Sequence, residues 1–343
     1  MTITQGSSSD RIPIWLDCDP GHDDAVGILM GVFLPQFELL GISASYGNAA
    51  PKKTAYNTLS LLTAMGKSRD IPVYAGAQKP WVREARYAPD IHGESGLDGT
   101  TLLPTPNVPL RTDMSYLCAM EKAIEAHAGR ISIVSTGSLT SVATLLKQKP
   151  HLKPKIKFIS IMGGGFHQGN SNLNGTAEFN IWIDPQAANS LFRDPAISHK
   201  CILVPLDLTH KAIATKTVEE RVLGDGSSDL RRLYYELFLF FGRTYENAQG
   251  FEAGPPVHDP LTLMPLLQFY GLENCEDVGF AYKRLDLLAV EDESDRNLGQ
   301  TKVLYEHSPE SSQGTIVGFE LNIDHFWNQF LSALDSASIN SPL

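Results

Sequence analysis

The sequence lacks several features that would assign it to common protein classes. None of its apolar runs approaches the ~20 residues that span a bilayer. Its first ten residues are polar and serine-rich, without the basic and apolar pattern of a secretion signal. Internal repeats, low-complexity tracts and linkers are also missing. These absences predict a soluble intracellular protein with no membrane partner, expected in the cytoplasm and with nuclear access left open.

Cysteine and positive charge are scarce as well. The four cysteines are scattered and form no CxxC pair, which argues against a zinc cluster and fits a reducing compartment. The formal net charge is -11, which disfavours nucleic acid and anionic membranes as partners. An acidic chain of this kind is compatible with a cation site.

Apolar strand-like runs alternate with helical patterns along the 343 residues. This alternation predicts the α/β class: an open, mostly parallel sheet flanked by helices, with a Rossmann-like core. We expect a disordered tail over 1–10, a single domain over 11–337 and a C-terminal tail over 338–343. Strands are expected at 12–19, 39–46, 71–74, 131–135, 155–162, 202–206 and 314–323, and helices at 24–34, 52–66, 114–128, 228–249 and 324–336, with others ending near 148, starting near 184 and ending near 269.

Residues 77–111 break this alternation. They hold several prolines and a polar, glycine-rich run at 91–99. A long loop of this composition in a compact enzyme is often a mobile lid, although a simple surface excursion explains it equally well.

The run Asp17-Cys18-Asp19-Pro20-Gly21-His22-Asp23-Asp24 lies between the first expected strand and the first expected helix. Ligands bind at this place, past the carboxyl end of a strand, in open α/β sheets. Four carboxylates so close together repel one another unless a cation, protonation or helix amides compensate them. Capping of the helix N-terminus explains Asp23 and Asp24, but it leaves Asp17 and Asp19 without a reason.

Other polar side chains follow later strands of the expected sheet, and parallel strands bring such positions to one edge. They are Asn48, Thr136, Glu178, Asn180, His258 and Asp259. A set rich in oxygen and free of thiolates suits Ca²⁺ or Mg²⁺, and several converging acids favour the more accommodating Ca²⁺. Such groups can hold vicinal hydroxyls and activate a water. His258 could protonate a leaving group, or it could be a structural loop histidine.

These motifs resemble the inosine–uridine-preferring nucleoside hydrolases, across nearly the whole chain and in the family's order. The runs that carry the resemblance are 17–24, 46–48, 92–93, 135–137, 162–165, 177–180 and 257–260. Residues 87–93 and 251–256 look most like the fungal, uridine-preferring branch. The resemblance implies the nucleoside-hydrolase fold and hydrolysis of the N-glycosidic bond of ribonucleosides, with free base and ribose as products.

For the metal, the resemblance implies one Ca²⁺ bound by Asp19, Asp24, Asp259 and the backbone carbonyl of Thr136. Asp19 would also act as general base toward a calcium-bound water. His258 would be the leaving-group acid, or at least an aromatic contact to the base.

For the substrate, the resemblance implies that ribose hydroxyls are held by Asp23, Asn48, Glu178, Asn180 and Asp259. Met162 would line the sugar pocket, and Asn172 would lie near the sugar, with Asn170 and Asn174 as alternatives. His92 would lie on the lid near the nucleobase. Tyr245 and Gln249 are spaced i, i+4 and could face the base. Equally, Tyr245 could pack in the core and Gln249 could face solvent.

Some points stay open in the sequence. His22 falls at a variable position of the acidic signature, as a loop histidine of no consequence or as a second titrating group. The role of Asp17 is not defined. Uridine is the favoured substrate, with purine ribosides or nicotinamide riboside as alternatives, and a homodimer or homotetramer is expected.

Two other classes of protein share part of this pattern. A haloacid-dehalogenase-type phosphatase also places two aspartates after a first strand, but here Pro20 and Gly21 interrupt the required pattern. A non-catalytic protein that binds calcium or nucleosides is disfavoured, because Asp19, Asp24 and His258 are all retained.

Overall fold

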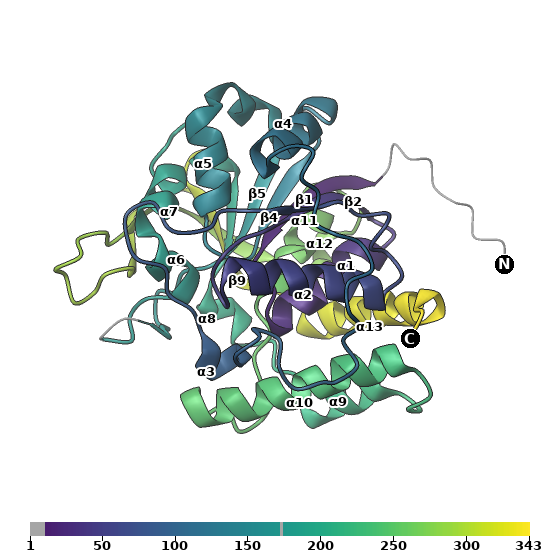
Figure 1. The fold of residues 1–343 in the computed structure, drawn as a ribbon. Helices are drawn as coiled ribbons and strands as arrows, with labels where there is room; N and C mark the ends of the chain where they lie inside the picture. The colour runs from purple at the N-terminus through teal and green to yellow at the C-terminus, as the bar shows by residue number, and fades with distance from the viewer. Residues whose placement is uncertain (1–10, 172–173) are drawn as a thin grey trace.

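The computed structural model describes residues 11–171 and 174–343 and contains a nine-stranded sheet in the order β3-β2-β1-β4-β5-β6-β9-β7-β8 (Figure 1). All pairs from β3 to β9 are parallel, whereas β7 runs antiparallel to both β9 and β8. The strands are β1 (Ile12–Cys18), β2 (Phe37–Ala44), β3 (Val73–Ala75), β4 (Ser132–Ser135), β5 (Phe158–Met162), β6 (Cys201–Val204), β7 (Ala281–Ala289), β8 (Thr301–Glu306) and β9 (Thr315–Glu320). The predicted α/β class with a mostly parallel sheet is confirmed.

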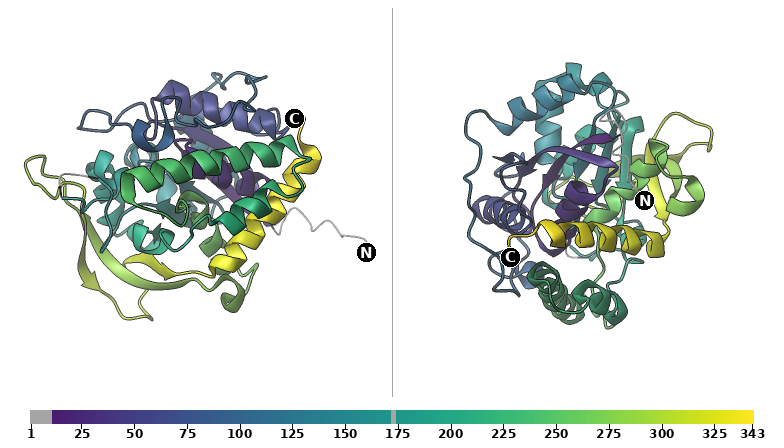
Figure 2. Two further views of the ribbon diagram at one scale, coloured as in Figure 1. Left: turned by 90° about the horizontal axis from the view of Figure 1, so that it is seen from below. Right: turned by 90° about the vertical axis from the view of Figure 1, so that its right-hand side faces the viewer.

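Helices cover both faces of this sheet (Figures 1 and 2). They are α1 (His22–Phe33), α2 (Pro51–Ala64), α3 (Pro89–His92), α4 (Tyr116–Ala126), α5 (Thr140–Gln148), α6 (Phe179–Ile183), α7 (Pro185–Phe192), α8 (Leu206–Thr209), α9 (Lys216–Leu223), α10 (Asp229–Gln249), α11 (Met264–Phe269), α12 (Cys275–Val278) and α13 (Ile323–Asn340). Short 3₁₀ turns span Pro150–Lys155, Ser198–Lys200 and Asp259–Thr262. No helix in the described part of the chain is long and apolar enough to cross a membrane.

Side chains of β1 point alternately to the two faces of the sheet, and each face is packed by its own hydrophobic core. Ile12, Ile14 and Leu16 join the core beneath α1, α2, α10 and α13, whereas Trp15 joins the core beneath α4, α5 and α7. A strand buried on both faces is apolar at nearly every position, and all seven residues of β1 are buried. Asp17 is the one charged residue within this strand, and Ser43 on β2 donates a hydrogen bond to its Oδ1.

Several element boundaries differ from those predicted, and three of the differences change where an element begins, how it is divided or where it ends. β5 begins at Phe158 rather than at 155, because Pro150 and Pro154 place residues 150–155 in a 3₁₀ turn. The helix predicted after residue 260 is interrupted, with a 3₁₀ turn at Asp259–Thr262 before α11.

The third difference is at the end of the chain. α13 extends to Asn340, so the predicted C-terminal tail at 338–343 begins within a helix. Ala337 is buried, and Ser338 and Asn340 donate hydrogen bonds to carbonyls four residues earlier. The predicted N-terminal tail lies outside the described residues.

The segment 77–111 contains a single short helix, α3, which packs against α10 (Figure 1). Thr244 Oγ1 on α10 donates to the carbonyl of Ile91, and Thr100 Oγ1 donates to Glu236 Oε2 of the same helix. The segment therefore lies over the carboxyl edge of the sheet with contacts to α10 on both sides of the glycine-rich run. Its mobility stays a prediction.

Candidate active site

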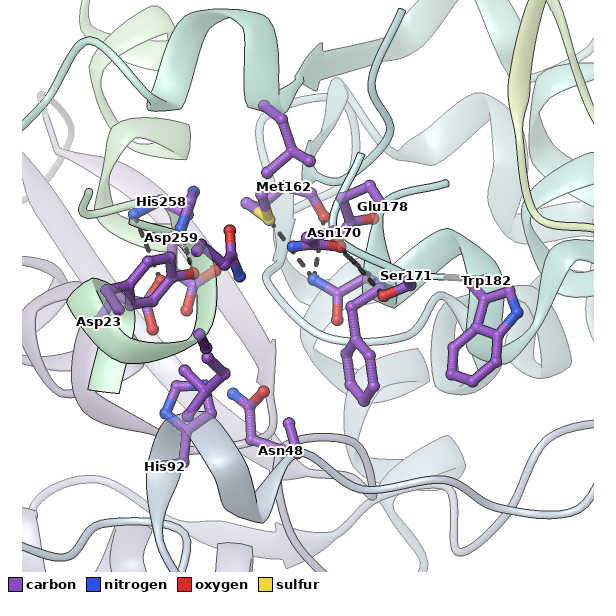
Figure 3. A pocket seen from close by; sticks show the side chains of 18 of the residues that line it. Asp23, Asn48, His92, Met162, Asn170, Ser171, Glu178, Trp182, His258 and Asp259 are labelled. Carbon is purple, nitrogen blue, oxygen red and sulfur yellow. Dashed lines mark hydrogen bonds between the residues drawn. The ribbon is translucent and has the colours of Figure 1, made fainter. Parts of the chain in front are cut away.

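A cavity of about 360 Å³ opens at the carboxyl edge of the parallel strands (Figure 3). Its walls come from the loops after β1, β2, β4 and β5 and from α3, α6 and α10. Predicted site residues that line it are Asp23, Asn48, His92, Thr136, Met162, Glu178, Asn180, Tyr245, Gln249, His258 and Asp259. A cavity of this size is typical of small-molecule sites.

Three buried carboxylates form the acidic centre of this site. Asp23, Asp24 and Asp259 each place an oxygen within 4.8 Å of the others. Asp24 is held by donors from three segments: the Gly21 amide at 3.0 Å, Thr136 Oγ1 at 2.8 Å and Asn48 Nδ2 at 3.2 Å. This group shares Asp24 and Asp259 with the predicted ligand set, and it includes Asp23 where Asp19 was expected.

Asp19 lies beside this cluster, fully buried, with one oxygen satisfied and one not. Its Oδ2 accepts from the Asn48 amide at 2.6 Å. Its Oδ1 is buried and has no hydrogen-bond partner among the described residues. Gly47 and Gly137 flank the carboxylate so closely that a Cβ at either position would overlap it. The two glycines thus form a cradle that fixes Asp19 and leaves one acceptor free.

The acidic residues carry strongly perturbed pKa values. Burial raises the pKa of Asp19 and Asp259 well above the usual carboxylate range, and neighbouring carboxylates raise them further. Burial, followed by repulsion from Asp24, raises the pKa of Asp23 to about 7. Charges that repel in a dry site need a counter-charge to remain ionised together. An unpartnered buried oxygen beside three converging carboxylates fits a hard cation with oxygen ligands.

The backbone carbonyl of Thr136, the remaining predicted metal ligand, belongs to a residue that lines the cavity. It accepts a hydrogen bond from Asn180 Nδ2 at 2.8 Å, which leaves its second lone pair available. Asn180 Nδ2 also lies 3.4 Å from the Met162 sulfur. Asn180 therefore connects the loop after β4 with Met162 at the end of β5.

Glu178 is held in a different way from the aspartates. It is the N-cap residue of α6, and its carboxylate accepts from the amides of Gly164, Asn180 and Ile181 at 2.8–3.0 Å. Burial nevertheless raises the pKa of Glu178 to about 7. The glycine-rich run after β5 thus supplies an amide that positions this carboxylate in the cavity.

His258 has both ring nitrogens engaged. Nδ1 lies 2.7 Å from Thr209 Oγ1, and Nε2 lies 2.8 Å from the Tyr245 hydroxyl. Burial, followed by the neighbouring His210, lowers the pKa of His258 well below its ordinary value. The imidazole is therefore neutral at pH 7, and both of its nitrogens already have protein partners although His258 lines the cavity.

Tyr245 and Gln249 both line the cavity from α10. Tyr245 is also 4% exposed and packs against Phe241, so the core and pocket interpretations of this residue both hold. Gln249 faces the cavity rather than solvent alone.

Of the three asparagines predicted as candidates for a place near the sugar, Asn172 lies outside the described residues. Asn170 lines the cavity beside Ser171 (Figure 3), whereas Asn174 donates to Asn297 away from it. Sequence reasoning missed Thr209, which carries no signal beyond its place after β6, and Trp182, which follows the recognised 177–180 run by two residues. Asp17, whose role the sequence leaves open, does not line the cavity, and neither do the predicted metal ligands Asp19 and Asp24.

Fold and site together define a metal-dependent class of hydrolase, and comparison with known proteins gives the family. The chain belongs to the inosine-uridine preferring nucleoside hydrolases, whose family model matches residues 14–328.

The chain is 58% identical over 329 residues to the uridine nucleosidase of Saccharomyces cerevisiae, covering 95% of this chain and 97% of that protein. It is 40% identical over 257 residues to the pyrimidine-specific ribonucleoside hydrolase RihA of Escherichia coli, covering 75% and 80% of the two chains.

Solved structures share the fold. A purine-preferring ribonucleoside hydrolase from Gardnerella vaginalis superposes with a TM-score of 0.82 at 24% identity, covering 95% of this chain and 99% of that one. A plant nucleoside hydrolase gives a TM-score of 0.79 at 25% identity, covering 94% and 98%.

Proposed function

We propose that this protein hydrolyses the N-glycosidic bond of ribonucleosides, with uridine as the favoured substrate, to release free base and ribose. The observation that carries the proposal is a nucleoside-sized cavity that Asp23 and Asp259 line, with the buried Asp24 and Asp19 beside them. The relatives named for uridine and pyrimidine ribonucleosides support the substrate.

Calcium suits the acidic end of the cavity, and Asp19, Asp24, Asp259 and the Thr136 carbonyl would hold it. Asp23 lies close enough to share this role, although we assign it to the ribose. A bound calcium ion supplies positive charge that keeps these carboxylates ionised, and it orients water and sugar hydroxyls.

The other residues hold the sugar and stabilise developing charge. Asp23, Asn48, Glu178, Asn180 and Asp259 surround the cavity with acceptors and amides for the ribose hydroxyls. Cleavage builds oxocarbenium character on the ribose, and carboxylates fixed around the ring stabilise that positive charge.

Asp19 is the group that takes a proton from the attacking water. Its Oδ1 has no hydrogen-bond partner in the part of the chain that the structure describes, and the two flanking glycines hold it in place, so it is free to accept a proton.

The leaving base is assisted through Tyr245 rather than by direct contact with His258. With its proton on Nε2, His258 donates to the Tyr245 oxygen and accepts from Thr209 at Nδ1. The Tyr245 hydroxyl hydrogen is then free to donate to a uracil carbonyl oxygen. His258 and Tyr245 together thus supply the acid function predicted for His258 alone.

The test is reducing-sugar release from uridine, cytidine, inosine, adenosine, deoxyuridine and nicotinamide riboside, with and without prolonged chelation. We expect release to be fastest from uridine and absent from deoxyuridine, which lacks the 2′-hydroxyl. Faster release from a purine or nicotinamide riboside would refute the substrate assignment. Bound calcium with no release from any of them would indicate a binding protein.

We also propose a compartment and an oligomeric assembly for this protein. All four cysteines are unpaired, which is consistent with a reducing compartment such as the cytoplasm. We expect a homodimer or homotetramer. The edge strand β8 exposes Val303, Leu304 and Tyr305, apolar area that a second copy would cover.

A further inference from the structure

Beside the glycine cradle of Asp19 lies a group of four buried polar side chains that no step of the proposed reaction uses. We call them the buried hydroxyl network: Tyr46, Ser138, Thr140 and Asp184, each at most 2% exposed. None of the four lines the cavity. Because buried polar groups are retained for the hydrogen bonds they make, the role of this network follows from its partners.

The side-chain oxygen of Thr140 is the centre of the network. It lies 2.9 Å from the Tyr46 hydroxyl and 3.2 Å from Ser138 Oγ. It also donates to Asp184 Oδ2 at 2.6 Å. Hydroxyl groups can donate or accept, so these contacts join the four side chains whichever way each hydroxyl points its hydrogen.

Two members of the network are direct neighbours of the cradle glycines. Tyr46 precedes Gly47, where a Cβ would lie 1.9 Å from Asp19 Oδ2. Ser138 follows Gly137, where a Cβ would lie 2.3 Å from Asp19 Oδ1. The two glycines stand on loops after different strands, β2 and β4, and each lies against one carboxylate oxygen. The network therefore connects the two loops that hold Asp19.

The other two members belong to the beginnings of helices. Thr140 is the first residue of α5, and Asp184 is the N-cap residue of α7, where its Oδ1 accepts from the Ala187 amide at 3.1 Å. The two helices contact each other. Asp184 Oδ2 also accepts from the Trp81 amide at 3.0 Å. The network is thus anchored on packed helices, which can hold a site more precisely than loops can.

We propose that Tyr46 is a positioning residue whose hydroxyl holds the two cradle loops at a fixed spacing and so sets the position of the Asp19 carboxylate. The loop after Tyr46 also carries the Asn48 amide, which donates to Asp19 Oδ2 at 2.6 Å. Loss of the hydroxyl lets Gly47 and this amide move away from the carboxylate. The kinetic consequence rests on the proposed function, whereas the consequence for cation binding can be measured without a substrate.

Tyr46→Phe and Thr140→Val test the proposal, because each removes one hydroxyl of the network. We expect kcat for uridine to fall about tenfold with a smaller change in KM, since a full 1 Å displacement of a catalytic group costs about 100-fold. Affinity for calcium, measured by competition with a chelator in the absence of nucleoside, should fall about fivefold, the equivalent of one neutral hydrogen bond. The double variant should resemble either single variant, because both substitutions break the same link.

Two further variants serve as controls. Thr140→Ser keeps the hydroxyl and should retain the wild-type kcat and calcium affinity. Tyr270→Phe is the matched control for Tyr46→Phe, because its hydroxyl also lies against another hydroxyl, Ser132 Oγ at 2.8 Å, but at the amino end of β4. It should change neither kcat nor calcium affinity.

Values of kcat and calcium affinity within twofold of wild type in both Tyr46→Phe and Thr140→Val would overturn the proposal. A loss in Thr140→Ser as large as that in Thr140→Val would also overturn it, because the hydroxyl would then not be the cause. Thr140→Val carries the test should Tyr46→Phe fold poorly. A wild type that binds calcium but cleaves no riboside, with weaker calcium binding in the two variants, would instead refute the proposed function and support this inference.

Discussion

The glycine cradle around Asp19 offers a sharp test of the site, because it can be perturbed without changing a polar group. In Gly137→Ala the added Cβ would lie 2.8 Å from Asp19 Cγ and would overlap Oδ1. The φ of Gly137 is not positive, so alanine meets no backbone strain there. The variant therefore reports on space around the carboxylate alone.

The expected size of the effect follows from this overlap. Ordinary contacts of a Cβ begin near 3.4 Å, so the Asp19 carboxylate must retreat by about 0.6 Å or more. A displacement approaching 1 Å in a catalytic group can lower the rate about 100-fold. Crowding a well-packed interior also costs about 1–3 kcal/mol of stability. We expect kcat for uridine to fall about 100-fold while the protein stays folded.

The assay is initial-rate uridine hydrolysis at saturating substrate, with bound calcium and thermal unfolding measured on the same samples. Gly31→Ala, within α1, is the matched control. Its added Cβ would lie 3.5 Å from Ile14 Cδ1, which is an ordinary van der Waals contact. The control should keep full activity. A kcat for Gly137→Ala within threefold of wild type, with calcium bound, would show that the position of Asp19 does not limit the reaction.

Four further outcomes are expected. Asp19→Ala should abolish turnover, because the proton acceptor and a metal ligand are lost together; near wild-type rates would exclude that role. His258→Ala and Tyr245→Phe should each lower kcat about 100-fold while calcium stays bound. If the two residues act as one unit, the double variant should have a kcat only slightly lower than that of either single variant. Loss of calcium in His258→Ala would show that the role of His258 is structural. Exhaustive chelation should lower Tm by several degrees, because calcium at 100 times its Kd adds about 2.7 kcal/mol to the free energy of unfolding. An unchanged Tm would argue against a metal among the buried carboxylates. Light scattering should give a dimer or tetramer, and a monomer would contradict that expectation.

The positions of the site residues were predictable because strand ends are visible in the sequence. Apolar runs that stop at Asp19, Asn48 and Thr136 mark three neighbouring strands, and parallel pairing brings their ends together. The recognised motifs added the residues that α6 and the 3₁₀ turn at 259–262 contribute. Periodicity could not fix the end of α13 or the start of β5, where side-chain hydrogen bonds and prolines decide the boundary.

Contacts between side chains from distant segments were beyond the sequence. Nothing in the spacing of Thr209, Tyr245 and His258 shows that the first two occupy both nitrogens of the third. Likewise, the acidic signature does not show that His22 reaches a carbonyl 76 residues away. Such contacts depend on the packing of α8, α10 and the segment 77–111 over the sheet edge, which local patterns do not encode.

Two buried carboxylates of the site, Glu178 and Asp19, differ in how the protein compensates their negative charge. Glu178 accepts hydrogen bonds from three backbone amides, which compensate part of its charge even though burial raises its pKa to about 7. Asp19 has one oxygen without a hydrogen-bond partner among the described residues, and it lies beside further acids. The negative charge of Asp19 is therefore less well compensated by the protein than that of Glu178. A bound cation would relieve this repulsion, and carboxylates held in this way would stabilise positive charge that develops on a ribose during cleavage.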